Sequence, residues 1–208
     1  GDLLGVPGSR SSLYAQRSEG NDIRIVYSLL EALAVARQNP DRPVFFLGIG
    51  FETTAPASAV GIIQARQEGL DNFFLYSAHK LMPPAMEAIV EDGVAIDGYL
   101  CPGHVSTITG SHIYRHIPSR YGLGCVISGF EPSDILQSIL MLVEQMETGR
   151  PDVEIQYRRA VKPEGNEKAL RFMDEVFEAT DDWWRGLGLL PNSGLSIRDA
   201  YREYDAEY

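Results

Sequence analysis

The feature that most restricts the fold of this chain is a repeated order of apolar segment, polar turn and amphipathic helix. Short apolar segments rich in β-branched and aromatic residues occur at Ile23–Tyr27, Val44–Ile49, Phe73–Tyr76, Ile96–Leu100 and Cys125–Ser128. Helical periodicity follows most of them, at Leu29–Arg37, Ala55–Gln67, Pro84–Val90 and Ser133–Glu147. This alternation is typical of parallel strands joined by crossover helices. We therefore predict the α/β class, with mostly parallel, Rossmann-like sheets that carry helices on both faces. The continuous apolar run Val44–Ile49 indicates a strand buried on both faces.

Charge and cysteine content exclude several classes of protein. The 208 residues carry a formal net charge of −11, which a phosphate backbone would repel, so we expect no nucleic-acid partner. No apolar run is long enough to cross a membrane, and we expect a cytoplasmic protein. The two cysteines can form neither a disulfide framework nor the four thiolates of an iron–sulfur cluster. The missing initiator Met and the charged stretch 196–208 predict a piece of a longer protein.

Polar turns follow the predicted strands, where open α/β sheets bind their ligands. These turns are Gly50–Pro56 (GFETTAP), Ser77–Lys80 (SAHK), Cys101–Ser106 (CPGHVS) and Gly129–Pro132 (GFEP). Because the carboxyl ends of parallel strands share one edge of a sheet, we expect the turns around Thr53 and His104 to meet there. Together they would form one polar pocket.

The GFETTAP turn combines groups suited to binding an anion or moving a proton. Gly50 permits a sharp turn, Thr53 or Thr54 can cap the following helix, and free N–H groups there can hold an anion. Glu52 can act as acid, base or hydrogen-bond acceptor. The alternative is a capping Thr beside a solvated first-turn carboxylate. Gly48 and Gly50 also match the start of a dinucleotide fingerprint, but Thr53 replaces its third glycine.

The CPGHVS turn places the Cys101 thiol close to the His104 imidazole, followed by the Ser106 hydroxyl. Such a set can bind a metal or couple acid–base and redox steps. The alternative is a buried, inert Cys101 and a His104 bonded to a backbone carbonyl. We expect Cys101 and Cys125 to be structural, whereas both interpretations of His104 stay open. The spacing of His112 and His116 favours a solvated helix face, and the Trp183-Trp184 pair a core or domain contact.

GFETTAP, CPGHVS and GFEPSDIL together resemble the HypD family of hydrogenase maturation proteins. The likeness extends over essentially the whole chain through five further segments, which are VPGS at Val6–Ser9, IRIVYS at Ile23–Ser28, KLMPPAM at Lys80–Met86, QYRRAVKPEGN at Gln156–Asn166 and GLGLLPNSGL at Gly186–Leu195. GFETT followed about fifty residues later by PGHVS is far more specific than either turn alone. Cys101 is a departure, because a glycine is expected there in many relatives.

The resemblance implies a scaffold on which the Fe(CN)2CO unit of [NiFe] hydrogenase is assembled. Two similar α/β domains would face each other across a cleft, and a further part would carry a [4Fe–4S] cluster. Partner maturation proteins would deliver the cyanide ligands, and a small chaperone would share the iron unit. The cleft residues in this chain would be Gly50, Phe51, Glu52, Thr53, Thr54, Pro102, Gly103, His104, Val105 and Ser106.

The family's Cys-Gly-x-His-x-His and Gly-Pro-Gly-Cys-Pro-Val-Cys motifs and its cluster cysteines do not occur in this sequence. We therefore expect no metal and no cofactor to be bound by this chain itself. Its contribution would be the polar wall of the cleft, which would position the diatomic ligands or donate hydrogen bonds to cyanide nitrogens.

The same resemblance suggests a division of the chain. Residues 1–40 would be a remnant of the first α/β domain, possibly joined by 183–208, whose missing strands would leave apolar surface exposed. Residues 41–150 would form a second, complete α/β domain, and 151–182 a helical connection. Two other functions stay open: a nucleotide-using Rossmann-like enzyme with Glu52 or His104 as acid–base, and a protein-interaction module without chemistry. Whether the family member is an enzyme or only a scaffold also stays open.

Overall fold

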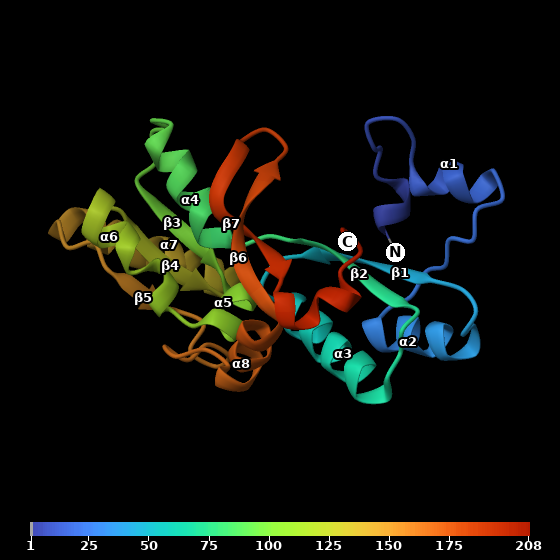
Figure 1. Ribbon diagram of the computed structural model, residues 1–208. Helices are drawn as coiled ribbons and strands as arrows, with labels where there is room; N and C mark the ends of the chain where they lie inside the picture. The colour runs from blue at the N-terminus through green and yellow to red at the C-terminus, as the bar shows by residue number, and fades with distance from the viewer. Residues whose placement is uncertain (1) are drawn as a thin grey trace.

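The computed structural model describes residues 2–208 and confirms an α/β fold (Figure 1). Its first sheet pairs two parallel strands, β1 (Val44–Gly50) and β2 (Phe73–His79), with Val44 opposite Phe73. Helices α2 (Leu29–Gln38) and α3 (Ala55–Glu68) pack against this sheet. A short 3-10 helix, η1 (Asp2–Gly5), and helix α1 (Leu13–Ser18) precede them.

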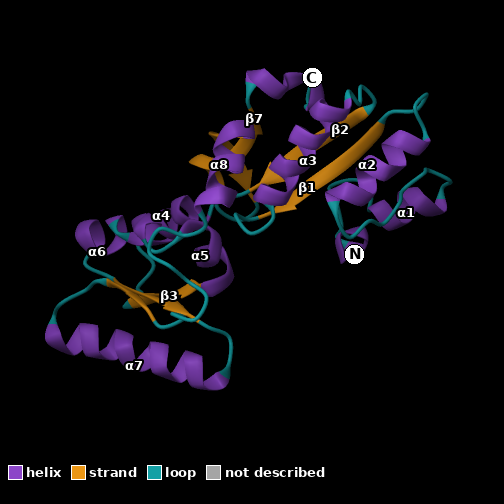
Figure 2. Ribbon diagram, turned by 90° about the horizontal axis from the view of Figure 1, so that it is seen from below, coloured by secondary structure: helices purple, strands orange, loops and turns teal. Residues whose placement is uncertain are grey.

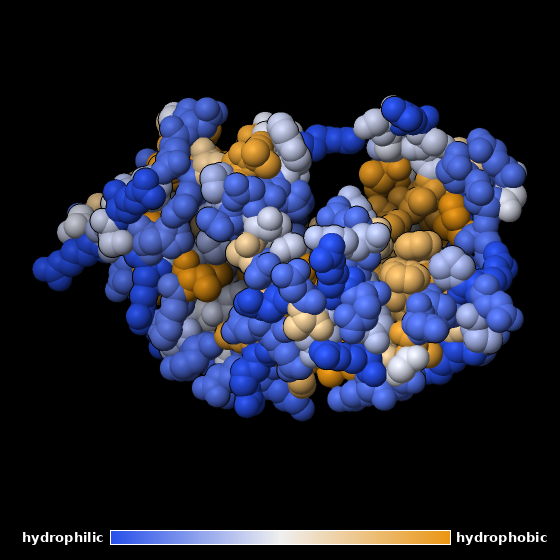
Figure 3. Space-filling view, in the orientation of Figure 1, coloured by the Kyte–Doolittle hydropathy of each residue, from blue (hydrophilic) through white to orange (hydrophobic). Residues whose placement is uncertain are grey.

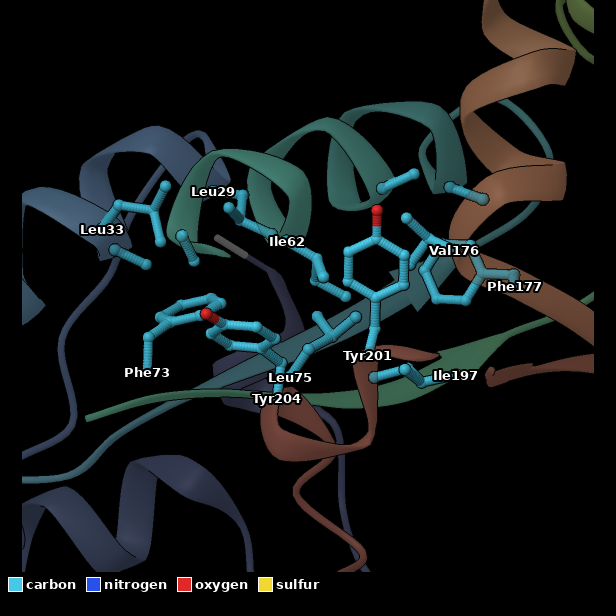
Figure 4. Close-up of a cluster of buried hydrophobic side chains, with 14 of the residues drawn as sticks. Leu29, Leu33, Ile62, Phe73, Leu75, Val176, Phe177, Ile197, Tyr201 and Tyr204 are labelled. Carbon is cyan, nitrogen blue, oxygen red and sulfur yellow. The ribbon is translucent and has the colours of Figure 1, made fainter. Parts of the chain in front are cut away.

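Fully buried apolar side chains join the first sheet to its helices (Figure 4). Leu33 of α2, Ile62 of α3 and both Phe73 and Leu75 of β2 have no exposed surface. Glycine at position 61 lets α2 approach α3, because a Cβ there would overlap the Leu29 side chain. Removal of this apolar surface from water is the main stabilising term of the unit.

The opposite face of β1 is open, so the prediction of a strand buried on both faces is wrong. Phe45, Leu47 and Ile49 are 60%, 39% and 45% exposed. The reason is that α2 and α3 cover only the face to which Val44 and Phe46 point. The open side borders an apolar hollow of about 480 Å³, which η1, α1 and the segment 22–26 also line (Figure 3).

The second sheet contains three parallel strands in the order β3-β4-β5. Its strands are β3 (Gly98–Pro102), β4 (Gly124–Ser128) and β5 (Val153–Ile155). Helix α7 (Pro132–Thr148) lies on one side of it, and α4 (Met82–Glu91), α5 (Gly103–Thr109), η2 (His112–Tyr114) and α6 (His116–Tyr121) lie on the other (Figure 2). Cys101 and Cys125 are free and buried in its core, which confirms that they pack as core residues.

The strands that we expected in one sheet over 41–150 are therefore divided between two sheets, each with its own buried cluster. The range 151–182, expected as a helical connection, contains α8 (Glu167–Val176) but also β5 and most of β6 (Phe177–Trp184). The physical reason is that β5 pairs with β4 and thereby completes the second sheet. The domain boundaries themselves stay a prediction.

The last part of the chain returns to the first sheet. β6 and β7 (Gly188–Ile197) form an antiparallel hairpin, followed by the 3-10 helix η3 (Asp199–Tyr204). The Ser77 hydroxyl of β2 donates a hydrogen bond to the Leu195 carbonyl at 2.6 Å. Tyr201 and Tyr204 are buried in the same cluster as Leu75 (Figure 4). Segment 183–208 is thus joined to the first sheet.

Candidate functional site

The GFETT turn begins where β1 ends. Gly50 has φ 141°, a conformation that other residues rarely adopt, and a Cβ there would overlap the Thr54 hydroxyl. Thr54 occupies the N-cap position of α3, yet its hydroxyl donates to the Phe51 carbonyl at 3.1 Å. The predicted cap by Thr54 is therefore not formed. Both Thr53 and Thr54 are exposed.

Glu52 points into the protein, although it stands between exposed neighbours. Only 2% of its surface is exposed. One carboxyl oxygen, Oε1, accepts a hydrogen bond from the Met82 N–H at 2.9 Å and so caps α4, whose own N-cap residue, Leu81, supplies no side-chain bond. The other oxygen, Oε2, is buried, and residues 2–208 offer it no hydrogen-bond partner. Burial raises the pKa of this carboxyl group, against the smaller opposing effect of the backbone bond. The alternative of a solvated first-turn carboxylate is wrong.

The PGHVS turn begins where β3 ends, and some of its side chains also point into the protein. Gly103 opens α5, and a Cβ there would overlap the Ser128 carbonyl of the neighbouring strand. Ser106 is completely buried, and its hydroxyl donates to the Pro102 carbonyl at 2.8 Å. Val105 is also buried. Ser106 and Val105 therefore support the turn from within.

His104 is exposed and stacks on an aromatic ring of the GFEP turn. Its ring centroid lies 4.1 Å from that of Phe130, at an angle of 33°. Phe130 in turn meets the Tyr157 ring edge-on at 6.2 Å. The turns that follow β3 and β4 are thus in contact at the carboxyl edge of the second sheet, as parallel strands require.

Tyr114 connects the interior sides of the two motifs. It is fully buried at the end of η2, and its hydroxyl shares a hydrogen bond with the Ser106 hydroxyl at 3.0 Å. Burial raises the pKa of Tyr114 well above its usual value. Tyr114 packs in the same buried cluster as Met86 of α4, the helix that Glu52 caps. Sequence reasoning missed Tyr114, because a single tyrosine in a loop matches no motif.

We expected the two motifs to share one edge of one sheet, and this prediction is wrong. Gly50 ends a strand of the first sheet, whereas Pro102 ends a strand of the second. Instead, the carboxyl end of β1 points toward the part of the chain that holds α4 and α5 (Figure 2). The predicted site residues divide into a buried group that includes Glu52 and Ser106 and an exposed group that includes Thr53, Thr54 and His104.

Comparison with known proteins identifies the family to which these motifs belong. The family model HypD, described as "Hydrogenase formation hypA family", matches residues 1–208. The chain belongs to the HypD family. A hydrogenase maturation factor HypD of Azotobacter vinelandii is 49% identical over 215 residues, covering 100% of this chain and 57% of that protein. The corresponding factor of Rhodobacter capsulatus is 47% identical over 209 residues, with coverage of 100% and 55%.

A putative hydrogenase expression/formation protein of Methanocaldococcus jannaschii is 44% identical over 205 residues, covering 99% of this chain and 57% of that protein. The chain therefore spans a little more than half the length of the relatives that it matches. Among residues 2–208, none of the helices combines the length and apolarity required to span a bilayer.

The glycines of this HypD-family chain that match a dinucleotide fingerprint serve packing. A Cβ at Gly48 would overlap the His79 ring. That ring is buried, and its two nitrogens lie 2.9 Å from the Gly48 carbonyl and 2.9 Å from the Ser58 hydroxyl. Burial lowers the pKa of His79 to about 4, so the ring is neutral at physiological pH. This contact gives the glycine a role that involves no phosphate.

The remaining histidines and tryptophans occupy separate positions. His112 lies in η2, whereas His116 begins α6 and has its Nε2 atom 3.0 Å from a Glu87 carboxyl oxygen. Trp184 lies near Phe51, with ring centroids 6.1 Å apart, but Trp183 is 71% exposed, so the predicted core role fails for Trp183. Within the described part of the chain, His, Cys, Asp and Glu side chains form no group of three or more that could hold a metal ion.

Proposed function

We propose that this chain is the part of a [NiFe] hydrogenase maturation scaffold that forms one wall of the assembly site for the Fe(CN)2CO unit. The iron unit would be the cargo of the whole protein. The names of the relatives support a role in hydrogenase maturation. Partner maturation proteins, including a small chaperone and a cyanide-delivering protein, would bring and receive the unit.

One observation carries this proposal: the buried connection through Tyr114. Its hydroxyl bonds to Ser106 of PGHVS, and it packs in one buried cluster with Met86 of α4, the helix that Glu52 of GFETT caps. Buried, hydrogen-bonded groups hold their neighbours in fixed positions. The exposed Thr53 and His104, which belong to the same two motifs, would thereby be held in a constant relation to each other.

The exposed groups match the chemistry of bound cyanide. A cyanide nitrogen accepts hydrogen bonds, and the Thr53 hydroxyl and the His104 ring N–H can donate them. Burial favours the neutral form of Glu52, which would avoid placing a carboxylate charge beside an anionic iron–cyanide group. Donors held in place before the cargo arrives stabilise it without a further cost of reorganisation.

The residues of this chain do not fit the [4Fe–4S] cluster expected for the full-length family protein. Such a cluster needs four thiolates. Only Cys101 and Cys125 are present, and both are buried within one sheet. We infer that the cluster is held elsewhere in the whole protein, and the proposed role of this wall requires no step through it.

The test is to assemble the iron unit on the full-length protein carrying Thr53→Val or His104→Ala. Infrared spectra of the loaded protein report the cyanide stretching bands, and hydrogenase activity reports complete maturation. We expect Thr53→Val to shift the cyanide bands and lower the amount of loaded protein, because a donor to cyanide is lost. Thr148→Val is the matched control, since that hydroxyl bonds only to the backbone of α7.

Unchanged bands and undiminished maturation in both variants would refute the proposal. Wild-type spectra combined with failed maturation would instead support a pure protein-interaction role for this surface. A nucleotide-using enzyme would be revealed by thermal stabilisation of the wild-type protein on addition of nucleotide.

A further inference from the structure

Helix α7 turns a mainly polar side toward the sheet that it covers, with Leu142 as an apolar contact there, and leaves most of its apolar residues outward. Its most buried residues are Asp134, Ser138 and Gln145, with exposures of 4%, 0% and 6%. They recur at a spacing that places them on one side of the helix. A helix that covers a sheet ordinarily turns its apolar side inward. Burial of apolar side chains therefore contributes less than usual to the packing of α7 on its sheet.

The inward side is held by a complete set of polar contacts. Arg159 donates two hydrogen bonds to the Asp134 carboxylate, at 2.9 and 2.5 Å, and thereby holds the pKa of Asp134 well below its usual range. Gln145 donates to the Glu154 carboxylate at 2.7 Å, and the Ser138 hydroxyl bonds to a serine hydroxyl of β4 at 2.9 Å. Because each of these inward groups has partners, rotation of the helix would break them. The orientation of α7 is therefore specified.

The outward side presents a continuous apolar stripe, which we call the α7 stripe. Its six members are between 39% and 68% exposed: Ile135, Leu136, Ile139, Leu140, Val143 and Met146. Leu136, Ile139, Val143 and Met146 have the three- and four-residue spacing of a helix-pairing seam. At 1.5 Å per residue the stripe is about 16 Å long, enough for three turns of a partner helix. Contiguous apolar surface of this kind marks an interaction site.

Acidic residues border the α7 stripe and indicate the charge of its partner. Glu144 and Glu147 are exposed next to its carboxyl-terminal half, and neither forms an ion pair within residues 2–208. From Pro132 to Thr148 the helix contains no basic residue. We propose that the α7 stripe docks an amphipathic helix of another protein, whose apolar side is bordered by Lys or Arg. Such a border would complement both glutamates and steer association.

A second copy of the chain matches this surface less well. Pairing two identical stripes would bring Glu144 and Glu147 of each helix close to acidic groups of the other. Each chain also carries a net charge of −11, which adds repulsion between copies. Like charges at an interface oppose association, whereas a basic partner gains from the same charges.

The test uses two synthetic helical peptides with the same leucine stripe, one bordered by Lys and the other by Glu. Their binding to the full-length protein is measured by fluorescence anisotropy at low and high salt. We expect the Lys-bordered peptide to bind more tightly, with an affinity that falls as salt rises. Leu136→Glu combined with Leu140→Glu should weaken it at least about tenfold, as loss of central apolar contacts does.

Two further variants make the result specific. Val94→Glu adds a charge at another exposed apolar residue, outside α7, and should leave binding unchanged. Glu144→Lys combined with Glu147→Lys alters only exposed positions, so it tests the charge argument even if the leucine variant fails to fold. It should reverse the preference between the two peptides.

Four outcomes would overturn the proposal: equal binding of both peptides, binding that the Leu136/Leu140 variant leaves intact, a dimer of the protein that this variant abolishes, or hydroxyl-radical labelling of the full-length protein that finds the side chains of the α7 stripe already covered.

Discussion

Replacing Glu52 by Gln tests whether this carboxyl group is as isolated from water as its position indicates. Gln has nearly the same shape, and its carbonyl oxygen can still accept the Met82 N–H bond that Glu52 accepts at 2.9 Å. The substitution removes only the titrating proton and the charge. Any difference in pH dependence between the two proteins therefore comes from the ionisation of Glu52.

The sign and size of the effect follow from the direction of the pKa shift. Burial raises the pKa of Glu52 in the folded protein above the usual value of 4.5. The folded state then keeps a proton that the unfolded state releases, so folding becomes less favourable as the pH rises above 4.5. The loss reaches at most about 1.4 kcal/mol per pH unit for one proton, and it ends once the pH exceeds the folded pKa. Glu52→Gln lacks this loss.

The assay is urea unfolding of wild type and Glu52→Gln between pH 4 and 8. The free energy of unfolding of the wild type, relative to the variant, should fall as the pH rises from the unfolded pKa of Glu52. Glu68→Gln, measured below pH 4.5, is a control of opposite sign, because Arg37 lowers the pKa of Glu68 and its contribution to stability is lost as the pH falls. A wild-type advantage that stays flat or grows with pH for Glu52 would refute the argument that this group is desolvated.

Three further substitutions test the packing. Tyr114→Phe should lower the free energy of unfolding by about 1 kcal/mol, because it deletes one buried hydrogen bond; an unchanged urea midpoint would contradict the connection to Ser106. Gly103→Ala should cost about 1–3 kcal/mol by overlap with a strand carbonyl, whereas Gly5→Ala, which meets nothing within 4 Å, should be neutral in the same assay. Ile62→Ala should cost about 2–5 kcal/mol, measured by calorimetry, because it leaves a cavity in the first cluster.

The sequence was sufficient to predict most strands and helices near the candidate site, because their signals are local. Val44–Ile49 is apolar throughout and β1 forms there; Ala55 begins a helix that Gly69 ends with φ 65°, as a terminal glycine predicts. The partners of the strands were not predictable in the same way. Apolar runs of similar composition in β1 and β3 do not reveal that they belong to different sheets.

The inward orientation of Glu52 was also beyond sequence reasoning. From the sequence, a glutamate between exposed residues at the start of a helix is predicted to be solvated. Glu52 becomes an acceptor for the Met82 N–H only because α4 packs against it. Tyr114 acquires its role through Ser106, eight residues away, in a loop without periodicity. In contrast, Gly50 was recognisable as a special position, because the turn needs a backbone conformation that other residues rarely adopt.

The return of the last segment to the first sheet has a consequence for how the protein is made. The cluster around Leu33 and Ile62 also contains Val176, Ile197 and Tyr204, which are synthesised more than a hundred residues later. A ribosome delivers the entire second sheet in the interval. The first sheet therefore stays incomplete, with apolar surface exposed, until the last segment is synthesised, whereas the second sheet can fold before then. We expect the nascent chain to fold in the reverse of its sequence order and to need protection from aggregation meanwhile.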